Sequence, residues 1–171
     1  MEYQIDARNQ RSQVVRVGRD DQEIGVFRKA SFFIHNLEGK VDGIEYQMKL
    51  AAPWTGFRYL LRQGGRDLAS AKRQSRLHAF EASRPLIRHR LVEFELDVQG
   101  RHYRLTPEDR HGLTHGLHDG DERCGRLAMR PFEAQQGGSW QADLEAPADW
   151  SAPLAAFVAW LAREGRRLME S

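Results

Sequence analysis

Residues 151–162 read SAPLAAFVAWLA, and the charged residues REGRR follow directly at 163–167. This segment is predicted to form a helix with well-marked ends, extending over about residues 151–169. Asp149 or Ser151 can cap its N-terminus, and Pro153 suits the first turn, where no intrahelical amide bond is lost. The arginines of the charged segment lie where the negative end of the helix dipole favours cations.

The predicted helix is apolar on every face between Leu154 and Ala162. A surface helix carries an apolar stripe on one side only, so a helix of this kind has to be surrounded by protein or by lipid. The apolar run is too short for lipid, because a helix that crosses a membrane needs roughly 20 apolar residues. We therefore expect the rest of the chain to enclose it, with Phe157, Trp160 and Leu161 buried.

The length of 171 residues suits a single domain, residues 1–171, with one core. A net charge of +2 gives no reason to expect a nucleic-acid partner. The single cysteine, Cys124, excludes an internal disulfide, and the first six residues have neither the basic start nor the apolar core of a signal peptide. These features predict a cytoplasmic protein without a transmembrane segment, whose contact with a membrane would be peripheral.

The chain before the helix reads as a series of short strands separated by turn residues. Alternation of apolar and polar residues is clearest at 44–50 and 92–98. Glycine-containing pairs at 64–65 and 99–100 are typical of tight hairpin turns. Strands are predicted at 3–5, 14–17, 25–29, 31–37, 44–50, 57–62, 67–72, 77–82, 92–98, 103–105, 113–117, 123–130 and 140–144. Further turns are predicted at 38–40, 42–43, 106–109 and 119–121.

The thirteen segments include the irregular start of the chain, where the number and pairing of the strands stay open. Roughly ten to twelve strands at this spacing indicate a β-sandwich or a β-barrel. A sandwich fills its core with side chains from two sheets and leaves no place for a helix that is apolar on every face. A closed sheet of more than about ten strands encloses an interior that has to be occupied. We therefore predict a mainly β fold, a closed antiparallel barrel over about residues 2–146 with the hydrophobic C-terminal helix through its centre.

The order of these elements resembles the tubby C-terminal-like family, which includes the tubby proteins, the phospholipid scramblases and the plant LURP-one-related proteins. The resemblance rests on the run of strands, on the turns at 64–65, 99–100 and Gly120, and on the apolar helix from 153 to 168. It implies a twelve-stranded barrel threaded by a hydrophobic C-terminal helix. It also implies a phospholipid-linked function, with anionic headgroup binding in the tubby proteins.

Three histidines, His111, His115 and His118, form the most obvious cluster of metal-ligand residues. On a helix the first two would share a face, but Gly112 and Gly116 disfavour a helix there. On a strand the first two lie roughly 13 Å apart at about 3.3 Å per residue, too far apart to bind one ion, and His118 points the other way. We therefore interpret the cluster as solvated turn residues and predict no metal, with a metal-dependent enzyme built on this segment as the alternative.

No catalytic centre stands out elsewhere in the sequence. Cys124 lies among charged residues in no nucleophile motif and is interpreted as a buried structural cysteine. Glu93, Glu95 and Asp97 occupy every second position of one strand, which favours a solvated outer face over a pair of catalytic carboxylates. The glycine pair at 64–65 lacks the helix and the lysine of a phosphate-binding loop, and no cofactor is predicted.

Basic residues gather in two neighbouring segments, at 72–76, interpreted as a turn region, and at 84–90, before the acidic strand. Such a cluster attracts an anionic membrane surface at about 1 kcal/mol per basic residue. Ordinary surface arginines, paired in part with Glu81, Glu93 or Glu95, are the alternative interpretation. The predicted anion-binding or headgroup-binding residues are Lys72, Arg73, Arg76, Arg84, Arg88 and Arg90.

Three functions follow from these patterns. The favoured one is a non-enzymatic barrel that binds anionic phospholipid headgroups at a membrane surface, or a protein partner. The second is a barrel that binds a small molecule, which a helix filling the interior would exclude. The third is the metal-dependent enzyme of the histidine segment.

Overall fold

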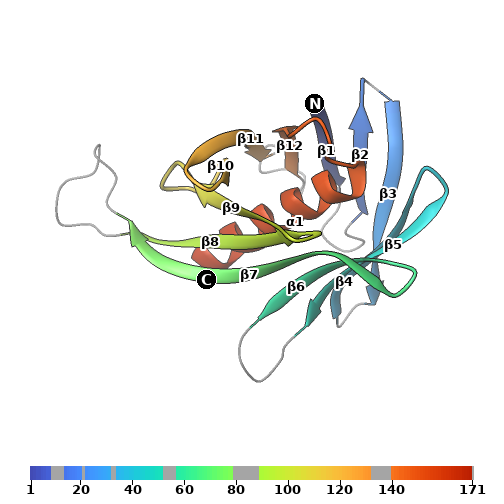
Figure 1. Cartoon of the computed structure of the whole chain (residues 1–171), viewed down its shortest axis with the longest axis horizontal. Coiled ribbons are helices and arrows are strands. Elements are labelled where there is room, and N and C mark those ends of the chain that lie inside the picture. The colour runs from blue at the N-terminus through green and yellow to red at the C-terminus, as the bar shows by residue number, and fades with distance from the viewer. Residues whose placement is uncertain are drawn as a thin grey trace.

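The structure is a computed structural model that describes residues 1–8, 14–20, 22–31, 34–51, 57–78, 89–131 and 140–170. Within these ranges twelve antiparallel strands form one closed barrel, and one α-helix follows them (Figure 1). The predicted fold class is therefore confirmed. No helix in these ranges is long and apolar enough to cross a membrane.

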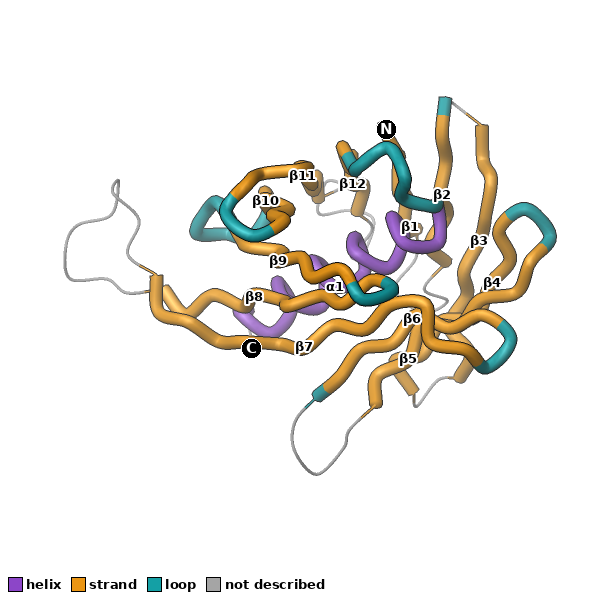
Figure 2. Tube along the Cα trace, in the orientation of Figure 1, coloured by secondary structure: helices purple, strands orange, loops and turns teal. Residues whose placement is uncertain are grey.

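Each strand pairs with its neighbours in sequence, and the last strand closes the barrel by pairing with the first. The strands are β1 (Glu2–Arg8), β2 (Val14–Arg19), β3 (Gln22–Ser31), β4 (Ile34–Val41), β5 (Ile44–Ala51), β6 (Arg58–Gln63), β7 (Arg66–His78), β8 (His89–Val98), β9 (Arg101–Pro107), β10 (Thr114–Asp119), β11 (Glu122–Pro131) and β12 (Trp140–Glu145). The helix, α1 (Ala152–Glu170), runs through the space that the strands enclose (Figure 2) and contacts strands on several sides of the barrel.

One end of the barrel is closed by short turns, and we call it the turn end. The connections β4–β5, β6–β7 and β8–β9 are two residues long, with positive φ at both positions. Asp42 and Gly43, for example, have φ values of 50° and 78°. Positive φ at both positions is the mark of type I′ hairpin turns, whose twist matches that of the flanking strands. The turns predicted at 42–43, 64–65 and 99–100 are thus confirmed.

The last turns of α1 lie at the opposite end, which we call the exit mouth. There Arg163 lies over the ring of Trp140, the first residue of β12. Gly165 packs against β8, and a Cβ atom at this position would lie 3.0 Å from the Phe94 ring. The absence of a side chain at Gly165 therefore lets the end of the helix approach the wall closely.

The core of the barrel is formed by α1 together with the inward-facing side chains of the strands. Every residue of α1 from Ala152 to Ala162 is buried, which confirms the predicted burial of Phe157, Trp160 and Leu161. Trp160 is 1% exposed, and its ring centroid lies 5.5 Å from that of Tyr59 in β6. The strand side chains that face the helix and are almost fully buried include Ile5, Val17, Phe27, Leu37, Met48, Leu61, Phe94, Leu105, Leu117 and Leu127.

The turn predicted at 38–40 is wrong, because these residues lie within β4. Gly39 stands opposite Phe27 of β3 and Tyr46 of β5. A Cβ atom on Gly39 would lie 2.2 Å from the carbonyl oxygen of Val26, much closer than atoms can approach. The glycine therefore serves the close approach of two strands rather than a change of chain direction.

We expect Gly39→Ala to lower the free energy of unfolding by about 1–3 kcal/mol, because the new methyl group forces β3 and β4 apart. The measurement is chemical denaturation of the variant beside the wild type. Lys40→Ala is the matched control, since the exposed Lys40 forms only an exposed ion pair with Glu45 and should change stability little. Equal stability of Gly39→Ala and the wild type would contradict the close packing at this position.

Several other boundaries also differ from those predicted. The strands expected at 67–72 and 77–82 are one continuous strand in β7, and residues 79–82 lie outside the described residues. The strand expected at 31–37 spans the end of β3 and the start of β4, with residues 32–33 outside the described part. The turn expected at 106–109 begins later, since Thr106 and Pro107 still belong to β9. Polar residues within these long strands look like strand ends in the sequence, so the continuity of the strands could not be predicted.

Candidate functional site

The six basic residues predicted to bind anions do not share a turn region, so that part of the prediction is wrong. Lys72, Arg73 and Arg76 lie in the long strand β7, and Arg90 lies in its partner β8. The backbone pairing sets Arg76 opposite Leu91 and Arg90 opposite Leu77. Only Lys72 and Arg73 have described side chains, and Arg84 and Arg88 lie outside the described residues.

Lys72 and Arg73 belong to a small basic and aromatic group at the exit mouth, which we call the Phe57 patch: Phe57, Arg58, Lys72 and Arg73. Phe57 is 46% exposed, and the Arg73 guanidinium lies 5.0 Å from its ring centroid. Arg58 stands opposite Lys72 in the strand register, and its guanidinium donates a hydrogen bond of 3.0 Å to the Ser70 hydroxyl. Arg73 is thus the cation that contacts the Phe57 ring, whereas Arg58 and Lys72 lie on the outer face of β6 and β7, the opposite face of the sheet from Arg73.

The end of α1 adds further arginines to this mouth. Glu164 is 2% exposed and forms an ion pair of 3.0 Å with Arg167. Burial raises the pKa of Tyr59, and the charge of Glu164 raises it further, while Arg73 and Arg167 act in the opposite direction. Glu164, Arg73 and Arg167 therefore each lie close enough to Tyr59 to influence it.

Arg163 is a half-buried cation of the mouth that contacts Trp140. Its guanidinium lies 5.8 Å from the Trp140 ring centroid, and burial lowers its pKa, although Glu164 acts to raise it. Within the described ranges nothing accepts a hydrogen bond from this guanidinium, and the buried indole N–H of Trp140 also lacks an acceptor. The Trp140 N–H is enclosed by protein, so it is a buried donor of the core and not an open binding group.

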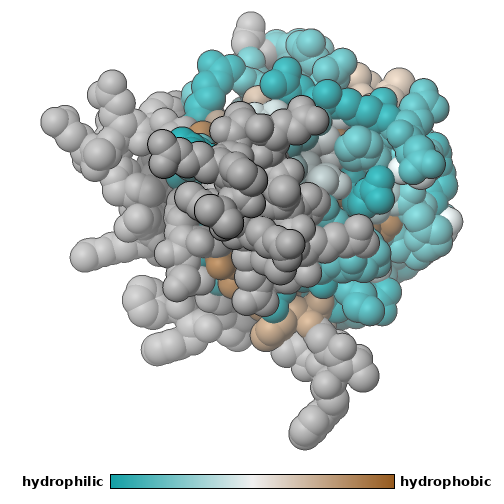
Figure 3. Space-filling model, turned by 90° about the vertical axis from the view of Figure 1, so that its left-hand side faces the viewer, coloured by the Kyte–Doolittle hydropathy of each residue, from teal (hydrophilic) through white to brown (hydrophobic). Residues whose placement is uncertain are grey.

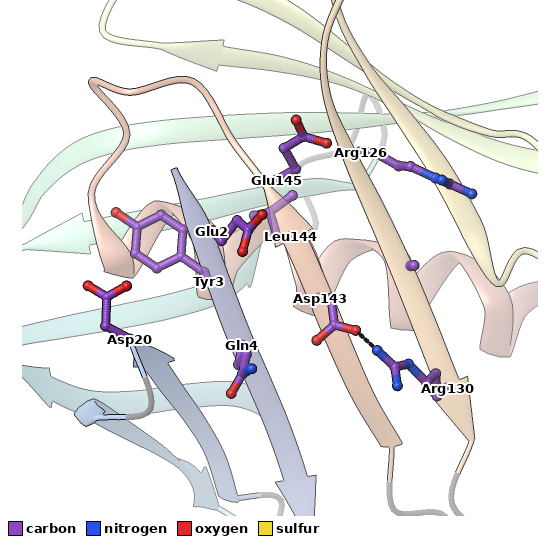
Figure 4. Close-up of a pocket in the computed structure, with 10 residues that line it drawn as sticks. Glu2, Tyr3, Gln4, Asp20, Arg126, Arg130, Asp143, Leu144 and Glu145 are labelled. Carbon is purple, nitrogen blue, oxygen red and sulfur yellow. Dashed lines mark hydrogen bonds and ion pairs between the residues drawn. The ribbon is translucent and has the colours of Figure 1, made fainter.

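A separate hollow of about 560 Å³ lies on the outer face of β1, β12 and β11 (Figure 4). Arg130 forms an ion pair with Asp143 there, and Glu2 stands opposite Glu145 in the strand register. The charged residues that line it are Glu2, Asp20, Asp143 and Glu145 against Arg126 and Arg130. Since the carboxylates outnumber the arginines, this hollow does not suit an anion.

The interpretation of the histidine segment as solvated turn residues holds for His111 and is wrong for His115. His115 lies in β10, faces the interior and is 1% exposed, whereas His111 is exposed in the preceding turn. Burial lowers the pKa of His115 to about 4, although the charge of Asp109 acts to raise it. Its Nδ1 atom has no hydrogen-bond partner in the described part of the chain. His115 is therefore a neutral core residue.

The turn before β10 is organised by the carboxylate of Asp109, which accepts hydrogen bonds from the backbone N–H groups of His111, Leu113 and Thr114. Burial acts to raise the pKa of Asp109, but these hydrogen bonds bring it below its usual value. On the outer face His118 and Glu108 lie over Gly116. No three His, Cys, Asp or Glu side chains gather as metal ligands within the described ranges.

Two further interpretations need correction. Glu93 is 3% exposed rather than solvated, whereas Glu95 of the same strand face is exposed as predicted. Cys124 is half-buried rather than buried, at a β-bulge where β11 has one residue more than β10. Burial raises the pKa of the Cys124 thiol, which makes it a poor nucleophile.

From the sequence alone, the arginines after residue 162 are interpreted only as cations that suit the C-terminal end of a helix. The contact between Arg163 and Trp140 depends on the closure of the barrel, so spacing along the chain could not reveal it. The sequence did contain a signal, because several arginines follow directly after a fully apolar helix. A helix that fills a barrel places its last side chains at the rim, so these arginines could have been predicted to lie there.

No family model, no curated protein and no solved structure matches the chain.

Proposed function

We propose that this barrel is a non-enzymatic binding protein that attaches to anionic phospholipid headgroups through its exit mouth. The Phe57 patch is the observation that carries the proposal. An exposed aromatic ring beside one guanidinium, with two further cations on the outer face of the same strands, suits the boundary between headgroups and acyl chains, where the ring inserts and the cations stay among phosphates. Each basic residue near an anionic surface contributes about 1 kcal/mol to the attraction.

The two other functions receive less support from the structure. A small-molecule barrel needs an open interior, whereas the side chains of α1 occupy the interior of this one. The metal-dependent enzyme needs ligands that converge, whereas His115 faces the interior and His111 lies exposed in a turn. Figure 3 views the molecule from the left-hand side of Figure 1, and the described surface seen there is mostly hydrophilic with small hydrophobic areas.

The proposal predicts that the protein sediments with vesicles that contain acidic phospholipid and does not sediment with neutral vesicles. The attraction is largely electrostatic, so binding should be strong at 0.01 M salt, where the Debye length is about 30 Å, and weaker at 0.15 M, where it is about 8 Å. A double variant, Phe57→Ala with Lys72→Gln, should bind acidic vesicles at least severalfold more weakly than the wild type.

The matched control is Ile44→Ala with Lys40→Gln at the turn end, which also removes one exposed apolar side chain and one lysine. Ile44 is 44% exposed, close to the value for Phe57, so both double variants should keep the wild-type melting temperature. A separate variant with Arg84, Arg88 and Arg90 changed to glutamine tests three of the other predicted residues. Equal binding to acidic and neutral vesicles, or equal loss in both double variants, argues for a protein partner instead.

A further inference from the structure

We propose that the turn end of the barrel contains a binding site for a small primary amine with an apolar body, between the β4–β5 hairpin and the start of α1. The site is a hollow of about 230 Å³, which we call the turn-end pocket. Its apolar walls include Val41, Ile44, Tyr46 and Trp150. The inference goes beyond the proposed function, because it concerns the end of the barrel opposite the exit mouth.

The turn-end pocket exists because the barrel interior is filled incompletely beside β5. The register sets Ile44 opposite Val41 and Met48 opposite Leu37, and the last three of these residues are almost fully buried. Because side chains alternate along a strand, Ile44 and Tyr46 point to the same inner side as Met48. Ile44 is nevertheless 44% exposed. The interior is therefore filled at the level of Met48 and still open at Ile44.

Two oxygen-bearing side chains supply the polar part of the turn-end pocket. Asp42 lies in the β4–β5 turn, and within the described ranges no cation or hydrogen-bond donor contacts its carboxylate. The Tyr46 hydroxyl has no hydrogen-bond partner in the same ranges. Burial raises the pKa of Tyr46, and the charge of Asp42 raises it further. Both oxygens accept hydrogen bonds, and an ammonium group offers three donors.

The cations that line the turn-end pocket already have partners. The Arg19 guanidinium lies 3.8 Å from the Asp20 carboxylate and 3.8 Å from the sulfur of Met1. The amino group of Met1 donates a hydrogen bond of 2.8 Å to the carbonyl oxygen of Ala146. The carboxylate of Asp42 is thus the charged group that a ligand finds without a partner, and it attracts an ammonium group and repels an anion.

The size of the turn-end pocket limits the apolar body of the ligand. Pockets for drug-sized molecules enclose about 300–1,000 Å³, and this pocket is smaller. Its walls combine aliphatic side chains with the aromatic side chains of Tyr46 and Trp150. A body of one aromatic ring therefore suits the pocket better than a long acyl chain.

Isothermal titration with phenethylamine at neutral pH tests the site. The wild type should show saturable binding, and Asp42→Asn should bind the amine at least fivefold more weakly. Asparagine tolerates the φ of 50° at this position, so the variant should keep the turn. Asp121→Asn is the matched control, because Asp121 is an exposed carboxylate in the β10–β11 turn on the opposite side of the barrel. This control should bind the amine as the wild type does.

Two further probes of similar shape separate the charge from the apolar contact. Phenethyl alcohol keeps the ring without the charge, so it should bind more weakly than the amine and equally to the wild type and Asp42→Asn. Hydrocinnamate, which carries a carboxylate, should bind least of the three. Ile44→Trp places a larger side chain in the pocket and should abolish binding of the amine.

Three results would overturn the amine site: no saturable binding of phenethylamine, equal binding by the wild type and Asp42→Asn, or tighter binding of hydrocinnamate than of the amine. Vesicle sedimentation provides an independent measurement. Asp42→Asn and Ile44→Trp leave the Phe57 patch intact, so their binding to acidic vesicles should equal that of the wild type. A parallel loss of amine and vesicle binding in both variants would show general damage to the fold and would also count against a separate site.

Discussion

Phe157→Ala is expected to lower the free energy of unfolding by about 3–5 kcal/mol, which threatens a domain whose total stability is typically about 5–15 kcal/mol. Phe157 is 0% exposed at the centre of the barrel, and its ring centroid lies 6.0 Å from that of Trp160. Removal of the ring loses its transfer free energy and leaves a cavity that strands on all sides cannot collapse to fill. Urea denaturation followed by tryptophan fluorescence measures the loss.

Phe57→Ala is the matched control, because it deletes the same ring from an exposed position at the exit mouth. Its free energy of unfolding should stay within about 0.5 kcal/mol of the wild-type value, as is usual for surface substitutions. A similar loss in both variants, or no loss in Phe157→Ala, would show that α1 does not fill the barrel.

The second large effect is a dependence of stability on pH that originates from His115. Burial lowers the pKa of this side chain from its ordinary value of 6.5 to about 4 in the folded protein, so the unfolded chain binds more protons between these two pH values. Stability therefore falls as the pH falls from 6.5 to 4, by about 3 kcal/mol in total at about 1.4 kcal/mol per pKa unit. Above pH 6.5 His115 is neutral in both the folded and the unfolded chain, so it causes no loss of stability there.

Comparison with His115→Leu isolates this contribution from that of the carboxylates, which titrate in the same range. Between pH 7.5 and pH 5 the wild type should lose about 2 kcal/mol more than the variant in urea denaturation. His102→Leu, which changes an exposed histidine of β9, should keep the wild-type pH dependence. Parallel pH profiles for wild type and His115→Leu would place His115 in contact with water.

The architecture could be predicted from the sequence because one segment, the apolar C-terminal helix, is compatible with few folds. A helix that is apolar on every face between Leu154 and Ala162 needs an enclosure, and the short alternating strands could supply only a closed sheet. The strand boundaries were less predictable. The sequence does not distinguish a glycine that forms a turn from a glycine, such as Gly39, that allows two strands to approach closely. Likewise, the polar residues of β7 suggested an interruption where the strand continues.

The candidate site could be predicted only in part. Lys72 and Arg73 were identified from charge density, but the exposed ring of Phe57 beside them depends on the pairing of β6 with β7. The burial of His115 and Glu93 could not be predicted. The alternation of apolar and polar residues assigns a residue to one face of the sheet, but it does not show what covers that face. A polar side chain in an alternating strand can equally point into the core.

The closure of the barrel by β1 and β12 has a consequence for the rate of folding. The Tyr3 hydroxyl donates a hydrogen bond to the carbonyl oxygen of Trp150, 147 positions later, and the strand register sets Tyr3 opposite Leu144. Such distant contacts are formed only after a large loss of chain entropy, and proteins dominated by them fold in milliseconds to seconds rather than microseconds. Until α1 emerges from the ribosome, the inward faces of all the strands lack their central partner. The nascent chain should therefore stay open to chaperones until synthesis of residues 152–162 is complete, and a ribosome stalled before this segment should carry a protease-sensitive chain.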